Sequence, residues 1–320
     1  MSIVVYYCGR YNNIMVRVVF MGTPKFASNC LSTLLEEHDV IGVVTQPERP
    51  SGRGRKLRPS EVNITAQKFK LPVITPNKIN EAAVIGELNQ WSPDVIVVAA
   101  YGQLLSNTII NLPTKGCINV HASLLPRHRG ASPIAAAIMA NDVHTGVTIM
   151  KIDAGMDTGP LLSQQEISIR SDHTTGTLTD SLAILGADLL RRTLPAYISG
   201  QISPIPQNPN LATYAPMMTK AFGHLSFDKT AQDLERKIRA MTPWPGAFAM
   251  HGEKRIKILQ AQAIVGSAQP GKITYLNKNI VVGTGYGLLQ LQQIQAPGKR
   301  PMQANDYVRG FQSFVGSILE

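Results

Sequence analysis

Residues 117–130 read CINVHASLLPRHRG, and the other features of the chain are arranged around this stretch. Apolar Ile118 and Val120 predict a short buried strand at its start. Side chains alternate along a strand with a period of two, so Asn119 and His121 project from the same face. An amide can hold a developing oxyanion, and an imidazole can move a proton near neutral pH. The pair also fits a strand edge with a hydrogen-bonded Asn and a surface His, because short motifs of this kind often occur without a catalytic role.

A carboxylate between two glycines adds a second feature. Asp157 lies 36 residues after His121, in the sequence DAGMDTGP of residues 153–160. Glycine lets the backbone bend sharply enough to aim such a side chain. Asn119, His121 and Asp157 are a sufficient set for acyl transfer to an amine. One group holds the oxyanion, one polarises the carbonyl, and the carboxylate manages the protons.

Short strands and helices alternate on both sides of this stretch. Strands are predicted over residues 16–21, 40–45, 72–75, 94–100, 146–150 and 163–169, and helices over 25–37, 61–70, 80–90, 132–140 and 177–197. This alternation predicts an α/β fold with a doubly wound, mostly parallel Rossmann-like sheet. The turn after the first strand reads GTPKF, which lacks the second glycine that a dinucleotide pyrophosphate needs.

A basic insertion follows the second predicted strand. Residues 46–59 read QPERPSGRGRKLRP, which is longer and more basic than an ordinary strand–helix connection. Two glycines and three prolines predict that it has no regular structure of its own. Its cations make it either a solvated loop or a contact for an anionic partner.

The C-terminal third has a different pattern. Residues 199–210, SGQISPIPQNPN, have the composition of a linker. A helix over 230–241 and a rigid TPWPG turn precede five short strands, predicted over 247–250, 256–261, 271–275, 280–283 and 288–293. Five such strands fit a small OB-type β-barrel, a frequent nucleic-acid binder, although a sandwich or a dimerisation barrel has the same periodicity.

These patterns divide the chain into four parts. We expect a leader or disordered tail at residues 1–14 before a start at Met15, a catalytic domain at 15–198, a linker at 199–216 and an OB-like domain at 217–320.

Charge and cysteine content indicate the partners and the compartment. Residues 207–320 hold 13 Lys and Arg against 6 Asp and Glu, whereas residues 1–206 hold 18 against 15. A basic C-terminal part on a nearly neutral body suits an enzyme that acts on a nucleic acid. The three cysteines, Cys8, Cys30 and Cys117, have no metal-binding spacing and favour a reducing cytoplasm. No apolar run approaches the roughly 18 residues of a membrane-spanning helix.

The sequence NVHASLLPRHRG followed by DAGMDTG resembles the formyltransferases that use 10-formyltetrahydrofolate. Matched residue by residue, the family's catalytic Asn, His and Asp fall on Asn119, His121 and Asp157. The folate-binding residues that we expect are Ser123, Leu124, Leu125 and Pro126 of the family's SLLP loop, and Tyr101 and Gly102 at the end of the strand 94–100. In this family the GTPKF segment lines the site, so Phe26 belongs either to the pocket wall or to the core.

Within that family, the basic insertion and the TPWPG turn look like the branch that acts on methionyl-tRNA. There the insertion grips the acceptor end of the tRNA, which implies tRNA contacts for Arg53, Arg55, Lys56 and Arg58. The SLLPRHRG motif is shared with relatives that act on small substrates, so the basic regions decide between the branches.

The resemblance implies formyl transfer from 10-formyltetrahydrofolate, as co-substrate, to the α-amine of methionine on initiator tRNA. We expect a monomer that needs no metal and has no membrane partner. Two alternatives remain: a formyltransferase that acts on an aminosugar nucleotide, and a non-catalytic RNA-binding protein on a formyltransferase scaffold.

Overall fold

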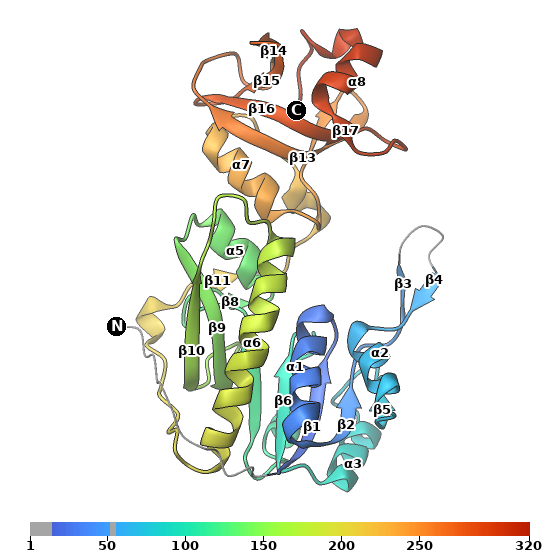
Figure 1. Cartoon of the computed structure of the whole chain (residues 1–320), viewed down its shortest axis with the longest axis vertical. Coiled ribbons are helices and arrows are strands. Elements are labelled where there is room, and N and C mark those ends of the chain that lie inside the picture. The colour runs from blue at the N-terminus through green and yellow to red at the C-terminus, as the bar shows by residue number, and fades with distance from the viewer. Residues whose placement is uncertain (1–14, 52–55) are drawn as a thin grey trace. The chain divides into compact units, whose positions relative to one another are not determined.

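The computed structural model describes residues 15–51 and 56–320 (Figure 1). The expected leader at residues 1–14 therefore lies outside the described residues. Two compact units can be distinguished. The first comprises the chain up to Pro133, together with His144–Ser168 and Thr179–Ala215. The second comprises Ile134–Val143, Ile169–Leu178 and Pro216–Glu320.

The first unit is built on a sheet in which the chain runs outward from β1 in both directions. The strands are β1 (Arg17–Gly22), β2 (Asp39–Val44), β5 (Val73–Ile74), β6 (Val95–Ala99), β7 (Cys117–His121), β9 (His144–Lys151) and β10 (Leu161–Ser168). Their order is β10-β9-β7-β6-β1-β2-β5. Pairing is parallel from β7 through β5 and antiparallel at β9 and β10. The expected doubly wound, mostly parallel Rossmann-like sheet is confirmed.

The first helix shows how apolar residues cover this sheet: Phe26, Ala27, Leu31 and Leu34 of residues 25–37 are buried. The helices of residues 15–198 are α1 (Lys25–Glu37), α2 (Glu61–Lys68), α3 (Ala82–Trp91), α4 (Asn107–Ile110), α5 (Pro133–Met139) and α6 (Thr175–Ile198). Every residue of β6 is buried, as expected for a strand covered on both faces. Phe26 is 5% exposed on α1, and a methyl group on Gly186 of α6 would lie 3.5 Å from its ring. Phe26 is therefore a core residue.

The basic insertion contains a short hairpin, so the prediction that it has no regular structure was wrong for six residues. Strands β3 (Arg49–Ser51) and β4 (Lys56–Arg58) pair antiparallel. Pro50 is tolerated because both strands are edge strands, where a missing N–H leaves no partner unsatisfied. Arg53 and Arg55 lie outside the described residues.

The second unit contains a curled antiparallel sheet, drawn from orange to red in Figure 1. Its strands are β12 (Phe248–His251), β13 (Lys254–Ile264), β14 (Ile273–Leu276), β15 (Asn279–Gly283), β16 (Leu288–Gln295) and β17 (Met302–Gln303). Buried Ile256 and Ile258 flank exposed Lys257 on β13, which is the alternation of a sheet with one buried face. The expected small OB-type domain is confirmed.

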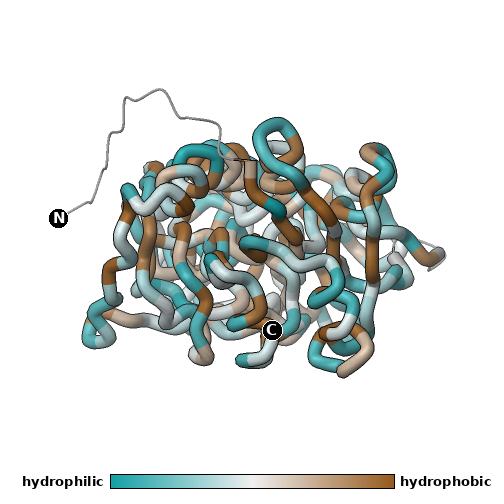
Figure 2. The backbone as a smooth tube through the Cα atoms, turned by 90° about the horizontal axis from the view of Figure 1, so that it is seen from below, coloured by the Kyte–Doolittle hydropathy of each residue, from teal (hydrophilic) through white to brown (hydrophobic). Residues whose placement is uncertain are grey.

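Short helical elements complete the described chain. They are α7 (Ala231–Ala240), α8 (Ala304–Gly310), and the 3-10 turns η1 (Pro209–Leu211), η2 (Lys220–Gly223) and η3 (Gln312–Phe314). Strand β17 and helix α8 were not predicted. Along the backbone, apolar stretches (brown) are short and interrupted by hydrophilic ones (Figure 2). None of the described helices is both long enough and apolar enough to cross a membrane.

Candidate active site

Strand β7 places Asn119 and His121 in the middle of the first sheet, between parallel β6 and antiparallel β9. Asn119 lies opposite Met150 and His121 opposite Thr148 on β9. The His121 side chain is 6% exposed, whereas Asn119 is half-buried. Among the described residues, the Asn119 amide has no hydrogen-bond partner, so its N–H groups are available to a ligand.

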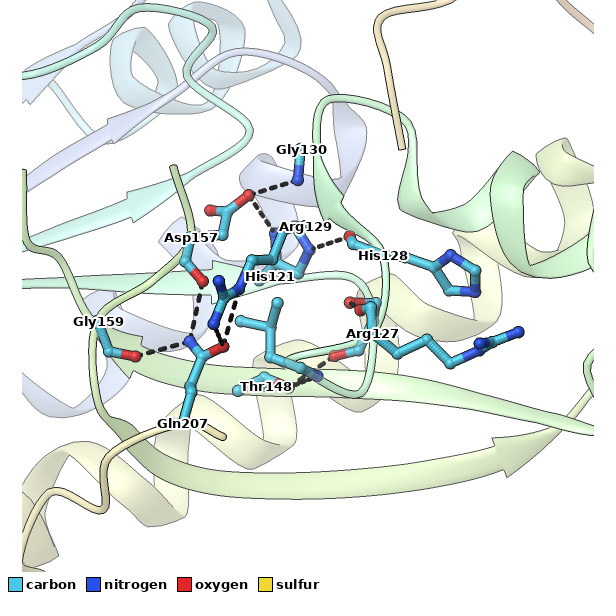
Figure 3. A network of polar contacts seen from close by, with 11 residues as sticks. His121, Arg127, His128, Arg129, Gly130, Thr148, Asp157, Gly159 and Gln207 are labelled. Carbon is cyan, nitrogen blue, oxygen red and sulfur yellow. Dashed lines mark hydrogen bonds and ion pairs between the residues drawn. The ribbon is translucent and has the colours of Figure 1, made fainter. Parts of the chain in front are cut away.

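A backbone carbonyl fixes the proton of the His121 ring. His121 Nε2 lies 3.1 Å from the carbonyl oxygen of His128. A carbonyl can only accept, so Nε2 carries the hydrogen and donates it. The other nitrogen, Nδ1, faces the carboxylate of Asp157, whose Oδ2 is 3.6 Å away (Figure 3). The structure thus brings together two of the three predicted catalytic side chains, and Nδ1 is the ring nitrogen left to take part in chemistry.

The Asp157 carboxylate is held at the end of a tight turn. Asp157 has a left-handed backbone (φ 53°), and its Oδ2 accepts a hydrogen bond of 2.8 Å from the Gly130 N–H. A side chain at Gly159 would collide with the Lys151 carbonyl, because a Cβ there would lie 1.9 Å from that oxygen. The glycine is required by this close approach, and the turn aims the carboxylate at the end of β7.

The other carboxylate of the turn has a structural role. Asp153 Oδ1 accepts hydrogen bonds of 3.0 Å from the Gly155 N–H and 2.6 Å from the Thr158 hydroxyl. These bonds hold the turn in shape, which leaves Asp157 as the carboxylate that contacts His121.

The SLLP loop is stabilised by a hydroxyl that sequence reasoning missed. The Thr148 hydroxyl, which is fully buried, donates to the Ser123 carbonyl (2.6 Å) and accepts from the Leu125 N–H (3.1 Å). Gln164 Nε2 donates to the Leu125 carbonyl (2.8 Å) and to the Thr148 hydroxyl (2.9 Å). The Ser123 hydroxyl is used within the loop, since it donates to the Arg127 carbonyl (2.6 Å). Leu125 is buried, whereas the neighbouring Leu124 and Pro126 of the expected folate site are half-buried.

The Tyr101 ring belongs to the core of the first unit. It is 2% exposed and packs with apolar residues of the sheet such as Met21 and Ile96. Burial raises the pKa of its hydroxyl to about 12. Its carbonyl accepts from the Thr23 hydroxyl (3.1 Å) and from Gln46 Nε2 (3.2 Å). Gly102, the next residue, is exposed with φ 88°.

The same glutamine joins the basic hairpin to this loop. Gln46 Oε1 accepts from Arg49 Nη2 at 2.9 Å, at the base of the hairpin. Lys56 lies opposite Ser51 in the hairpin, and Arg58, which is exposed, lies opposite Arg49. The described part of the hairpin is therefore linked through Gln46 to the end of β6.

The proline-rich segment 199–216 supplies further polar contacts to the site. Its Thr213 hydroxyl accepts from the His128 N–H at 2.8 Å, and strand β11 (Tyr214–Ala215) pairs with β8 (Arg129–Gly130). Gln207 contacts both Arg129 and the Asp157 turn (Figure 3). Neither residue was predicted, since a Gln or Thr in a linker-like sequence carries no local signal.

Two further observations concern the metal-ligating and thiol side chains of the described chain. No three His, Cys, Asp or Glu side chains gather there in a way that could hold a metal ion. Burial raises the pKa of the Cys30 and Cys117 thiols to about 12. Both thiols therefore stay protonated and unreactive near neutral pH.

Comparison with known proteins gives consistent matches over both parts of the chain. Residues 16–194 match the family described as formyl transferase, and residues 217–312 match the formyl transferase C-terminal domain. A methionyl-tRNA formyltransferase of Myxococcus xanthus is 45% identical over 302 residues, which are 94% of this chain and 97% of that relative.

Solved structures share the fold at low identity. An N-formyltransferase of Helicobacter canadensis, solved with folinic acid and dTDP-3-aminofucose, has a TM-score of 0.63 at 18% identity and covers 87% of this chain and 99% of its own. HypX of Aquifex aeolicus, solved with tetrahydrofolic acid, has a TM-score of 0.62 at 15% identity over 94% of this chain. This chain spans about half the length of HypX, 48%.

Proposed function

Because the chain belongs to the formyl transferase family, we propose that it transfers a formyl group from 10-formyltetrahydrofolate to the α-amino group of methionine on initiator methionyl-tRNA. The observation that carries this proposal is the 45% identity to a methionyl-tRNA formyltransferase over 97% of that protein. The similarity includes the C-terminal domain, which matches the family over residues 217–312. The substrates belong to translation, so the proposed compartment is the cytoplasm.

The proposed chemistry uses three groups at the end of β7. The unprotonated amine attacks the formyl carbon, a C–N bond forms, and the carbonyl oxygen becomes an oxyanion to which Asn119 donates. The intermediate collapses by breaking the C–N bond to the folate. The amine loses one proton and the folate nitrogen gains one, so the transfer is balanced. We assign the transfer of that proton to His121 Nδ1 and Asp157 Oδ2, and the 3.6 Å between them supports this assignment.

The proposed folate site is the SLLP loop together with Gly102. Solved relatives hold folate compounds on the same fold, which supports a folate-type donor. The Tyr101 ring is buried in the core, so we assign the contribution of its loop to backbone groups and to Gly102. We assign apolar contact with the pterin ring to Leu124, whose half-buried side chain supports this role.

The proposed tRNA contacts are the basic hairpin and the basic C-terminal part. Arg58 is exposed, Arg53 and Arg55 fall between the two hairpin strands in sequence, and Lys56 opens β4. Exposed cations such as Arg58 are suited to phosphates, and phosphate contacts make binding strongly dependent on salt.

One assay compares the candidate functions. The protein is incubated with 10-formyltetrahydrofolate and, in parallel, with charged initiator methionyl-tRNA, uncharged tRNA and an aminosugar nucleotide. We expect formyl-methionyl-tRNA from the first acceptor alone, and loss of most turnover in His121→Ala. Transfer to the sugar would favour a formyltransferase that acts on an aminosugar nucleotide. The solved N-formyltransferase of Helicobacter canadensis is 18% identical to this chain, so its similarity supports the fold alone. Binding of tRNA without any transfer would favour the non-catalytic alternative.

A further inference from the structure

We propose that Gln207 is a positioning residue that holds the Asp157 carboxylate facing Nδ1 of His121. Gln207 lies between the two family matches, which end at residue 194 and resume at residue 217. It rests in a segment whose composition predicts a linker, yet its side chain makes four hydrogen bonds within the first unit. The inference rests on the proposed function, because it assigns Gln207 an effect on that reaction.

The four hydrogen bonds allow one orientation of the Gln207 amide. Arg129 Nε and Nη2 lie 3.1 Å and 2.7 Å from Gln207 Oε1. A guanidinium only donates, so the amide oxygen must face Arg129. The amide nitrogen then faces the carbonyls of Asp157 and Gly159, at 2.9 Å and 2.7 Å, and carbonyls only accept. All four bonds are therefore satisfied at once, and flipping the amide would break every one of them.

A buried charge strengthens this arrangement. Arg129 is 4% exposed, and Gln207 is the hydrogen-bond partner of its guanidinium within the described residues. The guanidinium stays charged, and a buried charge without a polar partner is costly. Charge-assisted bonds are stronger than neutral ones, and they polarise the amide so that its N–H groups donate more strongly. Arg129 thus strengthens the hydrogen bonds that the Gln207 amide donates to the two carbonyls.

One of the two carbonyls belongs to a residue with an uncommon backbone conformation, and the other belongs to the glycine two residues further on. Asp157 is left-handed (φ 53°), a conformation that is uncommon outside glycine but that the short polar side chain of Asp tolerates. The bonds to the carbonyls of Asp157 and Gly159 hold the turn in that conformation. The carboxylate then stays 2.8 Å from the Gly130 N–H and 3.6 Å from His121 Nδ1. Without Gln207 the turn is free to relax, and a shift of about 1 Å in a catalytic group can cost about 100-fold in rate.

The experiment compares two Gln207 variants with a matched control. Gln207→Leu removes all four bonds at nearly constant volume, and Gln207→Glu keeps an oxygen for Arg129 while it loses the donor to the two carbonyls. The control is Asn210→Ala, because Asn210 is an exposed amide of the same segment whose side chain has no partner among the described residues. Thermal unfolding shows that each variant is folded. Initial rates then give kcat, and KM for the folate donor and for charged tRNA.

We expect Gln207→Leu to lower kcat about 10- to 100-fold, with both KM values within about two-fold of wild type. Gln207→Glu should lose turnover in the same direction, and it remains informative if Gln207→Leu does not fold. Asn210→Ala should match wild type. A folded Gln207 variant with wild-type kcat overturns the inference.

A double-mutant cycle tests whether the effect passes through Asp157. In an Asp157→Asn background, Gln207→Leu should lower kcat by less than about three-fold, since the group it positions is already disabled. An equal loss in both backgrounds overturns the positioning role. A wild-type protein that forms no formyl-methionyl-tRNA refutes the proposed function itself. An active wild type with equally active Gln207 variants refutes the role of Gln207 alone.

Discussion

Replacing Thr148 with valine removes one fully buried hydroxyl and changes the side-chain volume little. That hydroxyl donates to the Ser123 carbonyl at 2.6 Å and accepts from the Leu125 N–H at 3.1 Å. The substitution leaves both backbone groups without this partner beneath the SLLP loop. Each buried polar group left unsatisfied costs about 1–3 kcal/mol. With two such groups, we expect the free energy of unfolding to fall by about 2–6 kcal/mol.

The same strand supplies a matched control. Thr145 is 2% exposed on β9, and its hydroxyl is buried with no hydrogen-bond partner among the described residues. Thr145→Val therefore removes no bond and should change the free energy of unfolding by less than about 1 kcal/mol, in the stabilising direction. Two identical substitutions three residues apart then differ only in the hydrogen bonds that they remove.

Chemical denaturation and steady-state kinetics measure both effects. If the folate donor binds against the SLLP loop, it must order a loop that Thr148→Val has loosened. An ordering cost of about 1 kcal/mol raises KM for the folate donor about 5-fold, and KM for charged tRNA should stay unchanged. Equal stability losses in the two variants would refute the hydrogen-bond reasoning. A stability loss with an unchanged folate KM would refute the assignment of the loop to the folate.

Three further predictions concern the oxyanion, the tRNA and the thiols. Asn119→Ala should lower kcat about 10²- to 10³-fold in the formyl-transfer assay, because it removes the amide that we assign to the oxyanion; a loss under two-fold would contradict that role. Neutralising Arg53 and Arg55 should raise KM for charged tRNA and leave the folate KM unchanged. The slope of log affinity against log salt concentration should become shallower by about 0.7–0.9 for each lost phosphate contact. An unaltered slope would make the insertion a solvated loop. Burial raises the pKa of Cys30 and Cys117 from 9.0 to about 12, so the stability that their neutral thiols contribute is present below pH 9 and is lost as pH rises through about 12. Unfolding curves from pH 8 to 11 should show this fall, which should shrink in a Cys30→Ala, Cys117→Ala variant.

Local patterns were enough to predict the sheet and the central pair of side chains. The apolar run of β6 and the strand–helix alternation predicted a doubly wound fold, because the periodicity of a strand or helix can be recognised within a short stretch of sequence. The two-residue period likewise placed Asn119 and His121 on one face of β7. The flanking glycines singled out Asp157, 36 residues from His121, and the resemblance to the folate-dependent formyltransferases matched it to the family's catalytic Asp.

Backbone pairing explains the wrong prediction for the basic insertion. Glycines and prolines argued against regular structure, yet residues 49–51 and 56–58 pair as a hairpin. A hairpin of two edge strands needs no apolar periodicity, and Pro50 does not interrupt it. Hairpin pairing of this kind joins residues across a turn and leaves no alternating apolar pattern to detect.

Only the tertiary structure decided which polar residues face His121 and which hold the surrounding turns in shape. Asp153 and Asp157 look alike in sequence, but one braces the turn and the other faces His121. The Tyr101 ring proved to be core, although its position after β6 favoured a ligand loop. Gln207 meets the carbonyls of Asp157 and Gly159 across 50 and 48 residues of chain. Such partners are chosen by where the folded backbone leaves a carbonyl or a charge unsatisfied, and that is a property of the three-dimensional arrangement rather than of any local stretch of sequence.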